Sequence, residues 1–366
     1  MSNQNQQNFS ISNIKYPISS IERSIFATIA YYDYFNYPLT ATEIYYYLIN
    51  FEVKNSMPIG RQEKPKTKNT DQNQKTEENI QYPISNIEKE INQAKPSFYE
   101  VLKVLDNSQY LQQFIGQKNG FYFLAGREEI IKQRIQKKKL MDQKFKKTKW
   151  ILRFISYLPF VRLIMLSGSM GLGNPYKESD IDLLIVAKHG RIWTTRAILT
   201  FFTLVFGAYR HTGKTQNRLC LNHYITDRSL GVNFGNLYKA EEYLNLLPLA
   251  GDLDIYKKFF KENAWIKDYT YSVSGSLEKN LRAISLKGLP LKIKHFFEFL
   301  LCGLVGDYFE KYIKKFQIFF IEKNPLTKSP DARIRYDDNN LVFHPVLIET
   351  EVIGKWEEKM AKFVNF

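Results

Sequence analysis

The stretch MLSGSMGLGNPYKESDIDLLIVAK, residues 165–188, decides the fold of this chain. Its second half is an apolar run that predicts a strand, and it carries two acids, Asp180 and Asp182, one residue apart. Side chains alternate across a strand, so both acids point to one face with their Cα atoms about 6.5–7 Å apart. Ionised carboxylates held so close repel each other. A divalent cation that prefers oxygen ligands, such as Mg²⁺, relieves that repulsion.

The first half of the stretch predicts a turn that can receive a phosphate. A strand over 161–168 ends at Gly168, and Ser169 stands where a short helix begins. Backbone amides at a helix start lack partners and attract anions. Glycines such as Gly171 leave room for a close approach. The turn and the Asp-x-Asp strand therefore predict one site for Mg²⁺ and a polyphosphate.

These residues resemble the polymerase-β-type nucleotidyltransferase superfamily. Its pattern of an apolar residue, Gly, Gly or Ser, a gap and Asp-apolar-Asp is matched here by Gly168-Ser169 and Ser179-Asp180-Ile181-Asp182. The resemblance implies an α+β fold with a mixed sheet flanked by helices over 150–232. It also implies two Mg²⁺ ions and transfer of a nucleoside monophosphate from a nucleoside triphosphate to a hydroxyl acceptor, with release of pyrophosphate.

The resemblance assigns roles to individual residues. Asp180 and Asp182 would hold the metal ions as catalytic ligands, and Gly168 and Ser169 would contact the triphosphate. By position alone, the expected nucleotide contacts also include Gly171, Ser179 and Arg196, the last one turn into the helix that should follow the second strand.

One departure from the family's pattern concerns a third acid, usually on a later strand. In RLCLNHYIT, residues 218–226, the candidate position holds Asn222, and His223 is expected to point to the opposite face. An amide oxygen can ligate a cation but brings no negative charge. Three possibilities stay open: Asn222 suffices, Asp227 or another acid replaces it, or the domain only binds nucleotides.

Composition favours anionic partners. The 366 residues include 52 Lys and Arg against 37 Asp and Glu, a net charge of +15, which suits nucleoside triphosphates or nucleic acid. The two cysteines lack metal-type spacing and the N-terminus lacks an apolar signal segment, so a cytoplasmic protein is expected. The longest apolar runs, 197–209 and 296–306, are too short to span a bilayer. They predict buried helices and no membrane partner.

The first 130 residues predict a module of helices and a β-hairpin. Capping boxes, in which a hydroxyl and a Glu three positions later satisfy the first amides of a helix, begin at Ser19, Thr40, Ser85 and Ser97. Helices over about 20–34, 41–50 and 98–107, with two strands around GQKNG, resemble a winged helix. A polar stretch at about 53–95 predicts a flexible insertion within this module.

The remaining residues predict mostly helices. Residues 131–149 predict a basic connector helix, which is either a solvated face or a surface for RNA or DNA phosphates. A helix should lead into the central domain at about residue 150, and residues 233–366 should be mostly helical, with a hairpin at 333–345. We expect a Mg²⁺-dependent nucleotidyltransferase with an unknown hydroxyl acceptor. The alternatives are a catalytically weakened, antitoxin-like nucleotide-binding regulator and a DNA-binding regulator.

Overall fold

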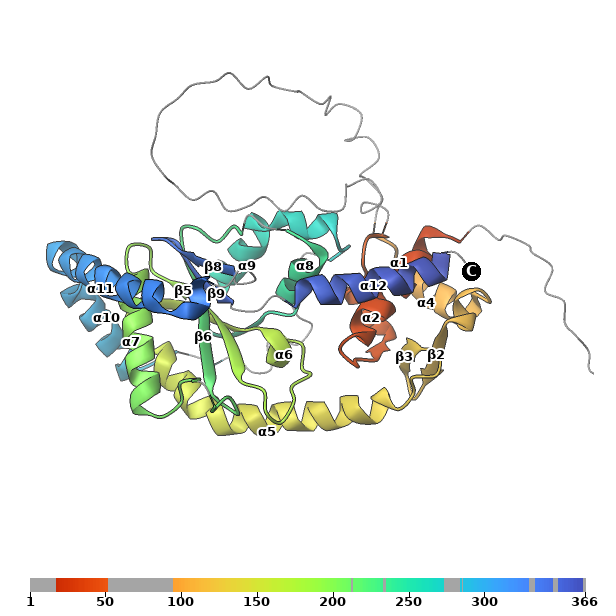
Figure 1. The fold of residues 1–366 in the computed structure, drawn as a ribbon, viewed down its shortest axis with the longest axis horizontal. Coiled ribbons are helices and arrows are strands. Elements are labelled where there is room, and N and C mark those ends of the chain that lie inside the picture. The colour runs from red at the N-terminus through yellow and green to blue at the C-terminus, as the bar shows by residue number, and fades with distance from the viewer. Residues whose placement is uncertain are drawn as a thin grey trace, which may run out of the picture.

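A mixed sheet forms the centre of the molecule. The computed structural model describes residues 18–51, 95–211, 213–232, 235–272, 284, 286–328, 333–344 and 348–364. Within these residues, six strands pair in the order β7-β4-β5-β6-β9-β8 (Figure 1). The inner strands with the motif are β4 (Val161–Leu166), β5 (Ile181–Ala187) and β6 (Leu219–Thr226). β5 and β6 are parallel, and the other neighbours are antiparallel. The expected α+β class with a mixed sheet is confirmed.

Three strands of this sheet come from the region expected to be mostly helical. β7 (Leu247–Gly251) pairs with β4, and β9 (Asn340–His344) pairs with both β6 and β8 (Arg333–Tyr336). The sequence predicted the hairpin but not its place in the central sheet, and it did not predict β7. Pro248 argues against a strand, yet it is tolerated because β7 lies at the edge of the sheet. The sheet thus extends beyond the expected boundary at residue 232.

Each face of the sheet is covered by its own apolar core. Leu184 and Val186 of β5 share a core with α8 (Leu237–Leu244), α9 (Leu253–Glu262) and α12 (Glu349–Val364). Their neighbours Leu183 and Ile185 pack on the opposite face with α5 (Ile130–Ser156), α7 (Ile192–Val205) and α11 (Gly303–Lys323). This alternation makes β5 apolar on both faces beyond the acids at its start.

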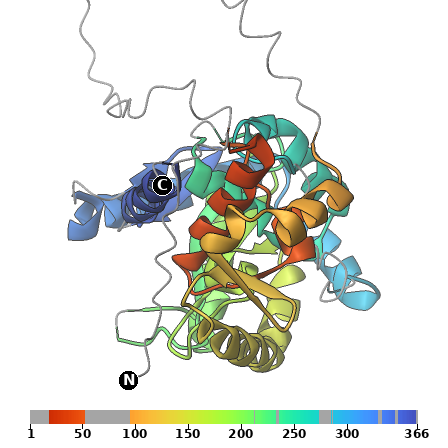
Figure 2. The ribbon, with the colours of Figure 1, turned by 90° about the vertical axis from the view of Figure 1, so that its right-hand side faces the viewer.

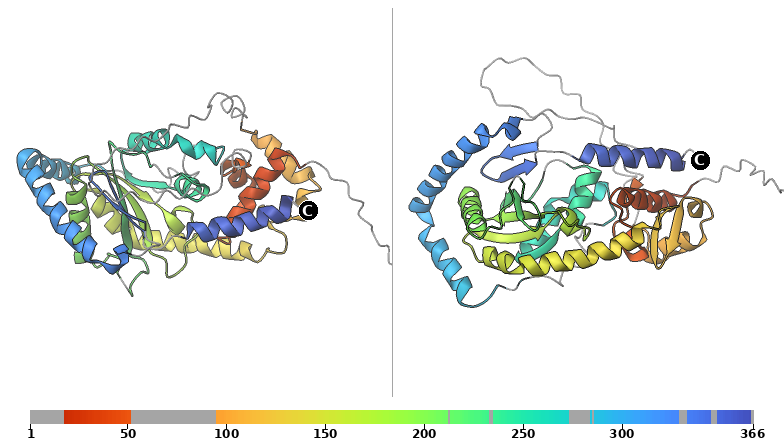
Figure 3. Two further views of the ribbon diagram at one scale, coloured as in Figure 1. Left: turned by 45° about the horizontal axis from the view of Figure 1, so that its top comes forward. Right: turned by 60° about the horizontal axis from the view of Figure 1, so that its bottom comes forward.

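The basic segment belongs to one continuous helix. α5 runs without a break from Ile130 to Ser156, so it joins the expected connector to the helix expected just before β4. It extends along the sheet from the N-terminal elements (Figure 3). No break in this helix marks the expected boundary between connector and central domain.

The N-terminal elements form a small unit of helices and strands. It contains α1 (Ser20–Asp33), α2 (Ala41–Tyr46) and α4 (Phe98–Asn107). A sheet of order β1-β3-β2 joins β1 (Leu39–Thr40), β2 (Ile115–Lys118) and β3 (Phe121–Leu124). The helices α1, α2 and α4 lie in the foreground of the view along this end of the molecule (Figure 2).

The predicted helix starts are confirmed where the structure describes them. Ser19, Thr40 and Ser97 each accept a hydrogen bond from the amide of the Glu three residues later, and that Glu accepts one in return. Ser85, and the predicted insertion at 53–95 except for its last residue, lie outside the described residues.

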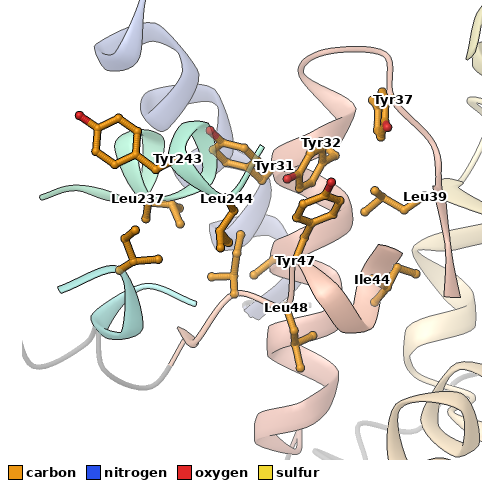
Figure 4. Close-up of a cluster of buried hydrophobic side chains, with 14 of the residues drawn as sticks. Tyr31, Tyr32, Tyr37, Leu39, Ile44, Tyr47, Leu48, Leu237, Tyr243 and Leu244 are labelled. Carbon is orange, nitrogen blue, oxygen red and sulfur yellow. The ribbon is translucent and has the colours of Figure 1, made fainter. Parts of the chain in front are cut away.

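The N-terminal unit shares its core with the rest of the chain. Tyr31, Tyr32 and Tyr47 from this unit pack near Tyr243 and Leu244 of α8 (Figure 4). α12 lies beside α1 in Figures 1 and 3, and the Trp356 indole donates a hydrogen bond of 2.9 Å to the Ala27 carbonyl. The two ends of the chain are therefore packed into one core.

The two long apolar runs are exposed, contrary to expectation. Run 197–209 exposes Phe201, Leu204 and Val205, and run 296–306 exposes most of its large side chains. Among the described residues, no helix is both long and apolar enough to cross a membrane. Run 197–209 also has a buried side, which includes Leu199, so the prediction of buried helices was wrong for the outer sides of the runs. An apolar stretch cannot reveal how much surface its neighbours leave uncovered.

Candidate functional site

The structure brings the two acids together with a cysteine. Asp182 is the second residue of β5 and Asp180 precedes the strand. Potential ligand atoms of Asp180, Asp182 and Cys220 all lie within 4.8 Å of one another. Asp182 shares its face with Leu184 and Val186, so the cluster lies on the sheet face that is covered by α8.

The pairing of β5 with β6 places the cysteine beside Asp182. Asp182 pairs with Cys220, but Leu184 pairs with His223, so β6 carries one extra residue between these pairs. Cys220 lies beside Asp182 through this pairing, and the shift that follows turns His223 to the acid-bearing face, whereas strict alternation had placed His223 on the opposite face. Asn222 lies in this irregular segment, is partly exposed, and does not belong to the cluster of potential metal ligands.

A guanidinium that the sequence did not single out contacts this cluster. Arg210 Nε lies 2.9 Å from Asp180 Oδ2, and Arg210 Nη1 donates to Cys220 Sγ at 3.3 Å. Residue 210 follows an isolated bridge between Tyr209 and Leu219. This bridge lays the segment alongside the start of β6. Arg210 therefore provides a positive charge beside the acids.

The environment of Asp182 disfavours its ionised form. Burial raises the pKa of Asp182 to about 7, and repulsion from Asp180 and Glu242 acts in the same direction, while the Cys220 hydrogen bond and Arg210 oppose it. A group destabilised by lost hydration and like charge gains most from a bound cation. The arrangement therefore favours a cation at Asp182.

The donor set fits a hard divalent cation through its two carboxylates. Mg²⁺ prefers oxygen ligands and takes few of them from the protein. Cys220 is a poor ligand for it, because thiols are soft and because burial, together with Asp182 and Asp180, raises the pKa of this thiol well above its usual range. Asp180 and Asp182 would hold the ion, and Cys220 would lie beside it as a neutral neighbour.

The Gly-Ser turn lies directly beside Asp182. The Ser167 amide donates to the Asp182 carbonyl at 3.0 Å, and the four-residue helix α6 (Gly168–Gly171) follows. Gly168 has φ +56°, and a Cβ there would lie 2.5 Å from Asp182 Oδ2. Only glycine allows the turn to approach the carboxylate this closely. The predicted juxtaposition of turn and acid is therefore present.

The other residues expected around the turn lie near it, but several make contacts within the protein. The Ser169 carbonyl accepts from the Asn174 amide at 2.8 Å, and Ser179 Oγ accepts from the Tyr176 amide at 2.9 Å. Gly171 is buried, and a Cβ there would lie 2.8 Å from the Asn245 carbonyl. The small size of Gly171 thus serves packing against the end of α8.

Arg196 is not brought to the acids. It lies on α7, the helix that covers the opposite face of the sheet. Its guanidinium contacts the Gln317 side chain and lies 4.8 Å from the Phe343 ring centroid. Arg196 was selected because it lies one turn into the next helix. Its position in the sequence does not show on which face of the sheet that helix packs.

A third carboxylate approaches from α8. Glu242 accepts a hydrogen bond of 3.1 Å from Ser167 Oγ, in the turn itself, and its charge raises the pKa of Asp182. Asp227, the acid considered from the sequence, instead accepts from the His189 amide at 2.8 Å after the C-terminal end of β6. Sequence patterns gave no reason to select Glu242, because it lies 75 residues after Ser167, on a helix that packs beside the turn.

A buried lysine from the basic helix anchors the loop before Asp180. Lys144 Nζ donates to the carbonyls of Lys177 and Ser179, both at 2.8 Å, and to Asn217 Oδ1 at 3.2 Å. Burial lowers the pKa of Lys144, although Glu178 and Asp180 oppose this shift. This part of the basic segment therefore positions the loops that lead into β5 and β6.

No protein-family model, curated protein or solved structure matches this chain.

Proposed function

We propose that this protein is a Mg²⁺-dependent nucleotidyltransferase, which moves a nucleoside monophosphate from a nucleoside triphosphate to a hydroxyl acceptor and releases pyrophosphate. The observation that carries the proposal is the contact between turn and acid. The Cβ position of Gly168 is 2.5 Å from Asp182 Oδ2, so a phosphate beside the turn would also lie beside the carboxylates.

Each group in the site has a role in this reaction. Asp180 and Asp182 would hold Mg²⁺, which when bound neutralises charge on the phosphate oxygens. The first amides of α6 orient a phosphate, since the first amides of a helix have no partner within it. Arg210 adds positive charge beside Asp180, and Glu242 supplies a third carboxylate next to the turn. Asn222 then need not serve as the third ligand.

The decisive test is pyrophosphate release by the full chain with Mg²⁺, each of the four nucleoside triphosphates and an oligoribonucleotide or cell extract as the acceptor. Asp182→Asn keeps the size of the side chain but removes its charge. The rate should fall by at least about a hundredfold, because metal charge neutralisation contributes several kcal/mol to such reactions. Asp254→Asn, at an exposed position in α9, is the matched control and should leave the rate unchanged.

Two outcomes would contradict the proposal. Nucleotide binding without turnover would identify a nucleotide-binding regulator, the weakened form considered from the sequence. Turnover that survives Asp182→Asn and chelation of divalent cations would place the chemistry elsewhere.

A second candidate function, contact with RNA or DNA, is favoured by a row of cations on α5. Lys132, Lys139, Lys146 and Arg153 are exposed and stand seven residues apart. Seven residues make two turns of helix, so these side chains project to one side at intervals of about 10.5 Å. Lys137 and Lys144 point inward instead and are buried. We infer that the exposed row could hold the phosphates of a nucleic-acid acceptor.

Charge reversal tests this candidate. In Lys139→Glu/Lys146→Glu, oligonucleotide affinity should fall and the salt dependence should weaken, since each lost phosphate contact reduces the slope against log salt by about 0.9. Fluorescence anisotropy at two salt concentrations measures both quantities. Lys257→Glu/Lys261→Glu on α9 makes the same charge change on another exposed helix. Equal losses in both variants would indicate a non-specific effect of net charge.

The N-terminal unit is better suited to packing than to binding DNA. Its helices and its strand order β1-β3-β2 support the winged-helix-like arrangement inferred from the sequence. The exposed side of α4 presents Glu100 and Asp106 beside Lys103, which disfavours phosphate contacts. We infer that this unit acts in packing, through the core it shares with α8 and α12, and not as a reader of DNA sequence.

A further inference from the structure

Helices α10 (Leu289–Leu300) and α11 carry a large uncovered apolar surface. On α11, a stripe with four-residue spacing consists of Leu304, Tyr308, Tyr312, Phe316 and Phe320, all exposed. Leu304 is 88% exposed and Tyr308 is 76% exposed. Residues four apart share one side of a helix. Contiguous apolar surface of this kind marks a contact with a partner or a membrane.

α10 continues the same surface across the bend between the helices. Ile293, Phe296, Phe297 and Phe299 are exposed on it, and Phe299 near the bend is 78% exposed. α10 and α11 lie along the outer edge of the molecule, at the end away from the N-terminal helices (Figures 1 and 3). We call the exposed side chains of α10 and α11 the outer face. Because the outer face lies at the edge of the molecule, it can contact a flat surface.

Three acids of these helices make contacts with the rest of the protein. Glu298 accepts from the Phe160 amide at 2.7 Å and from Arg162 at 2.8 Å. Glu310 accepts from the amides of Trp193 and Thr194 at the start of α7, both at 2.9 Å. Asp307 pairs with Arg191 at 2.6 Å. These three acids are therefore used within the protein.

Several lysines of the same helices are exposed, whereas Lys294 is buried and Lys314 forms an ion pair. Lys292, Lys311 and Lys315 are exposed, and no ion pair within the described residues engages them. Lys311 and Lys315 each stand three residues after a tyrosine of the aromatic stripe. The outer face thus combines aromatic and aliphatic side chains with positive charge, and its chemical complement is apolar with negative charge.

We propose that the outer face docks on the surface of a lipid bilayer that carries anionic headgroups. Amphipathic helices with aromatic and aliphatic residues on one side and lysines beside them lie in the interface plane of such membranes without crossing them. Tyrosine rings suit the headgroup level, and lysine stems extend so that their charges reach lipid phosphates. This contact would bring the nucleotide site to a membrane surface.

A second copy of the chain fits this face less well. A two-fold interface brings the same patch of both copies together. The outer face would then oppose lysines to lysines, while Glu298, Glu310 and Asp307 are already used inside each copy. Anionic lipid supplies the negative charge that the aromatic stripe of another copy lacks.

Vesicle flotation of the full chain tests the proposal. The protein should float with phosphatidylcholine vesicles that contain about a third phosphatidylserine, and much less with phosphatidylcholine alone. Lys311→Glu/Lys315→Glu should weaken binding at least about tenfold, because each lysine near an anionic surface contributes substantially to attraction. Leu304→Ser/Tyr308→Ser should also weaken it. Both pairs are exposed, so their circular dichroism should match that of the parent protein.

The control variant is Lys257→Glu/Lys261→Glu on α9, which makes the same charge change on another exposed helix. It should retain vesicle binding. Loss of binding equal to that of Lys311→Glu/Lys315→Glu would overturn the proposal, as would absence of binding to anionic vesicles. Light scattering that shows a dimer dissociated by Leu304→Ser/Tyr308→Ser would assign the face to a second copy instead.

Discussion

At the scale of single residues, backbone conformation and close packing both require glycine at position 168. Its φ of +56° is left-handed, and a Cβ would meet Asp182 Oδ2 at 2.5 Å. Gly168→Ala should cost about 1–2 kcal/mol of stability from the backbone alone. It should also displace the carboxylate, so nucleotide turnover should fall far more than stability. Chemical denaturation and pyrophosphate release measure the two effects.

Gly190→Ala separates these two effects. Gly190 has φ +75°, but apart from its chain neighbours no atom would lie within 4 Å of an added Cβ. It should lose similar stability while keeping turnover. If both alanine variants keep full turnover, the contact between the turn and Asp182 has no functional role.

The residues of the site show where sequence reasoning succeeds and where it stops. Asp180, Asp182 and Gly168 are local to one motif, and the structure brings them together as expected. Cys220 was missed because the two cysteines lack metal-type spacing, and Arg210 was missed because it precedes β6 in a segment that an isolated bridge holds beside that strand. Long-range packing decides the positions of Arg196 and Glu242, and no local pattern records it.

At the scale of elements, α5 positions the loops of the candidate site through its inner side. Its inner side delivers Lys144 to three oxygen acceptors in the loops before β5 and β6. Lys144→Met should cost about 1–3 kcal/mol, because it removes a buried charged donor from three partly buried oxygen acceptors. Turnover should fall as well, since the loop that ends at Asp180 loses its anchor.

The matched control is Lys147→Met, an exposed position one turn away on the same helix. Lys147→Met makes the same lysine-to-methionine change, and it should have little effect on either stability or turnover. An equal loss in both variants would show that the general charge of α5 matters and that the Lys144 contacts do not.

Helix and strand positions were largely predictable, because caps and periodicity act over a few residues. The three described capping boxes begin at the expected serines and threonine, and β4, β5 and β6 lie within a few residues of their expected ranges. Burial was not predictable in the same way. The runs 197–209 and 296–306 are as apolar as core segments, but nothing in the described part of the chain covers their outer sides.

At the scale of the whole molecule, a buried carboxyl links the N-terminal unit to the site domain. Glu241 of α8 accepts a hydrogen bond of 2.7 Å from Tyr32 of α1. Burial raises the pKa of Glu241 from its ordinary 4.5 to about 8, although the Tyr32 hydrogen bond opposes the shift. The folded state therefore holds this carboxyl neutral over a range in which the unfolded chain ionises it.

This shift makes stability depend on pH. The contribution of Glu241 should be complete below pH 4.5 and lost as pH rises through about 8, at about 1.4 kcal/mol per pH unit in between. Glu241→Gln should flatten this fall in denaturation midpoints measured from pH 5 to 9. The exposed Glu358→Gln is the control. An unchanged slope in Glu241→Gln would assign the pH dependence to other groups.

The shared sheet also constrains the order in which the molecule can be built during translation. β6 bears Cys220, yet its outer edge is closed by β9, more than a hundred residues later. β4 likewise lacks its partner on one edge until β7 has been synthesised. While the ribosome is still synthesising those later residues, both site strands present open edges with unpaired amides and carbonyls, the kind of edge that recruits foreign strands. A nascent chain released before residue 344 would thus leave the strands of the candidate site exposed to aggregation and dependent on chaperones.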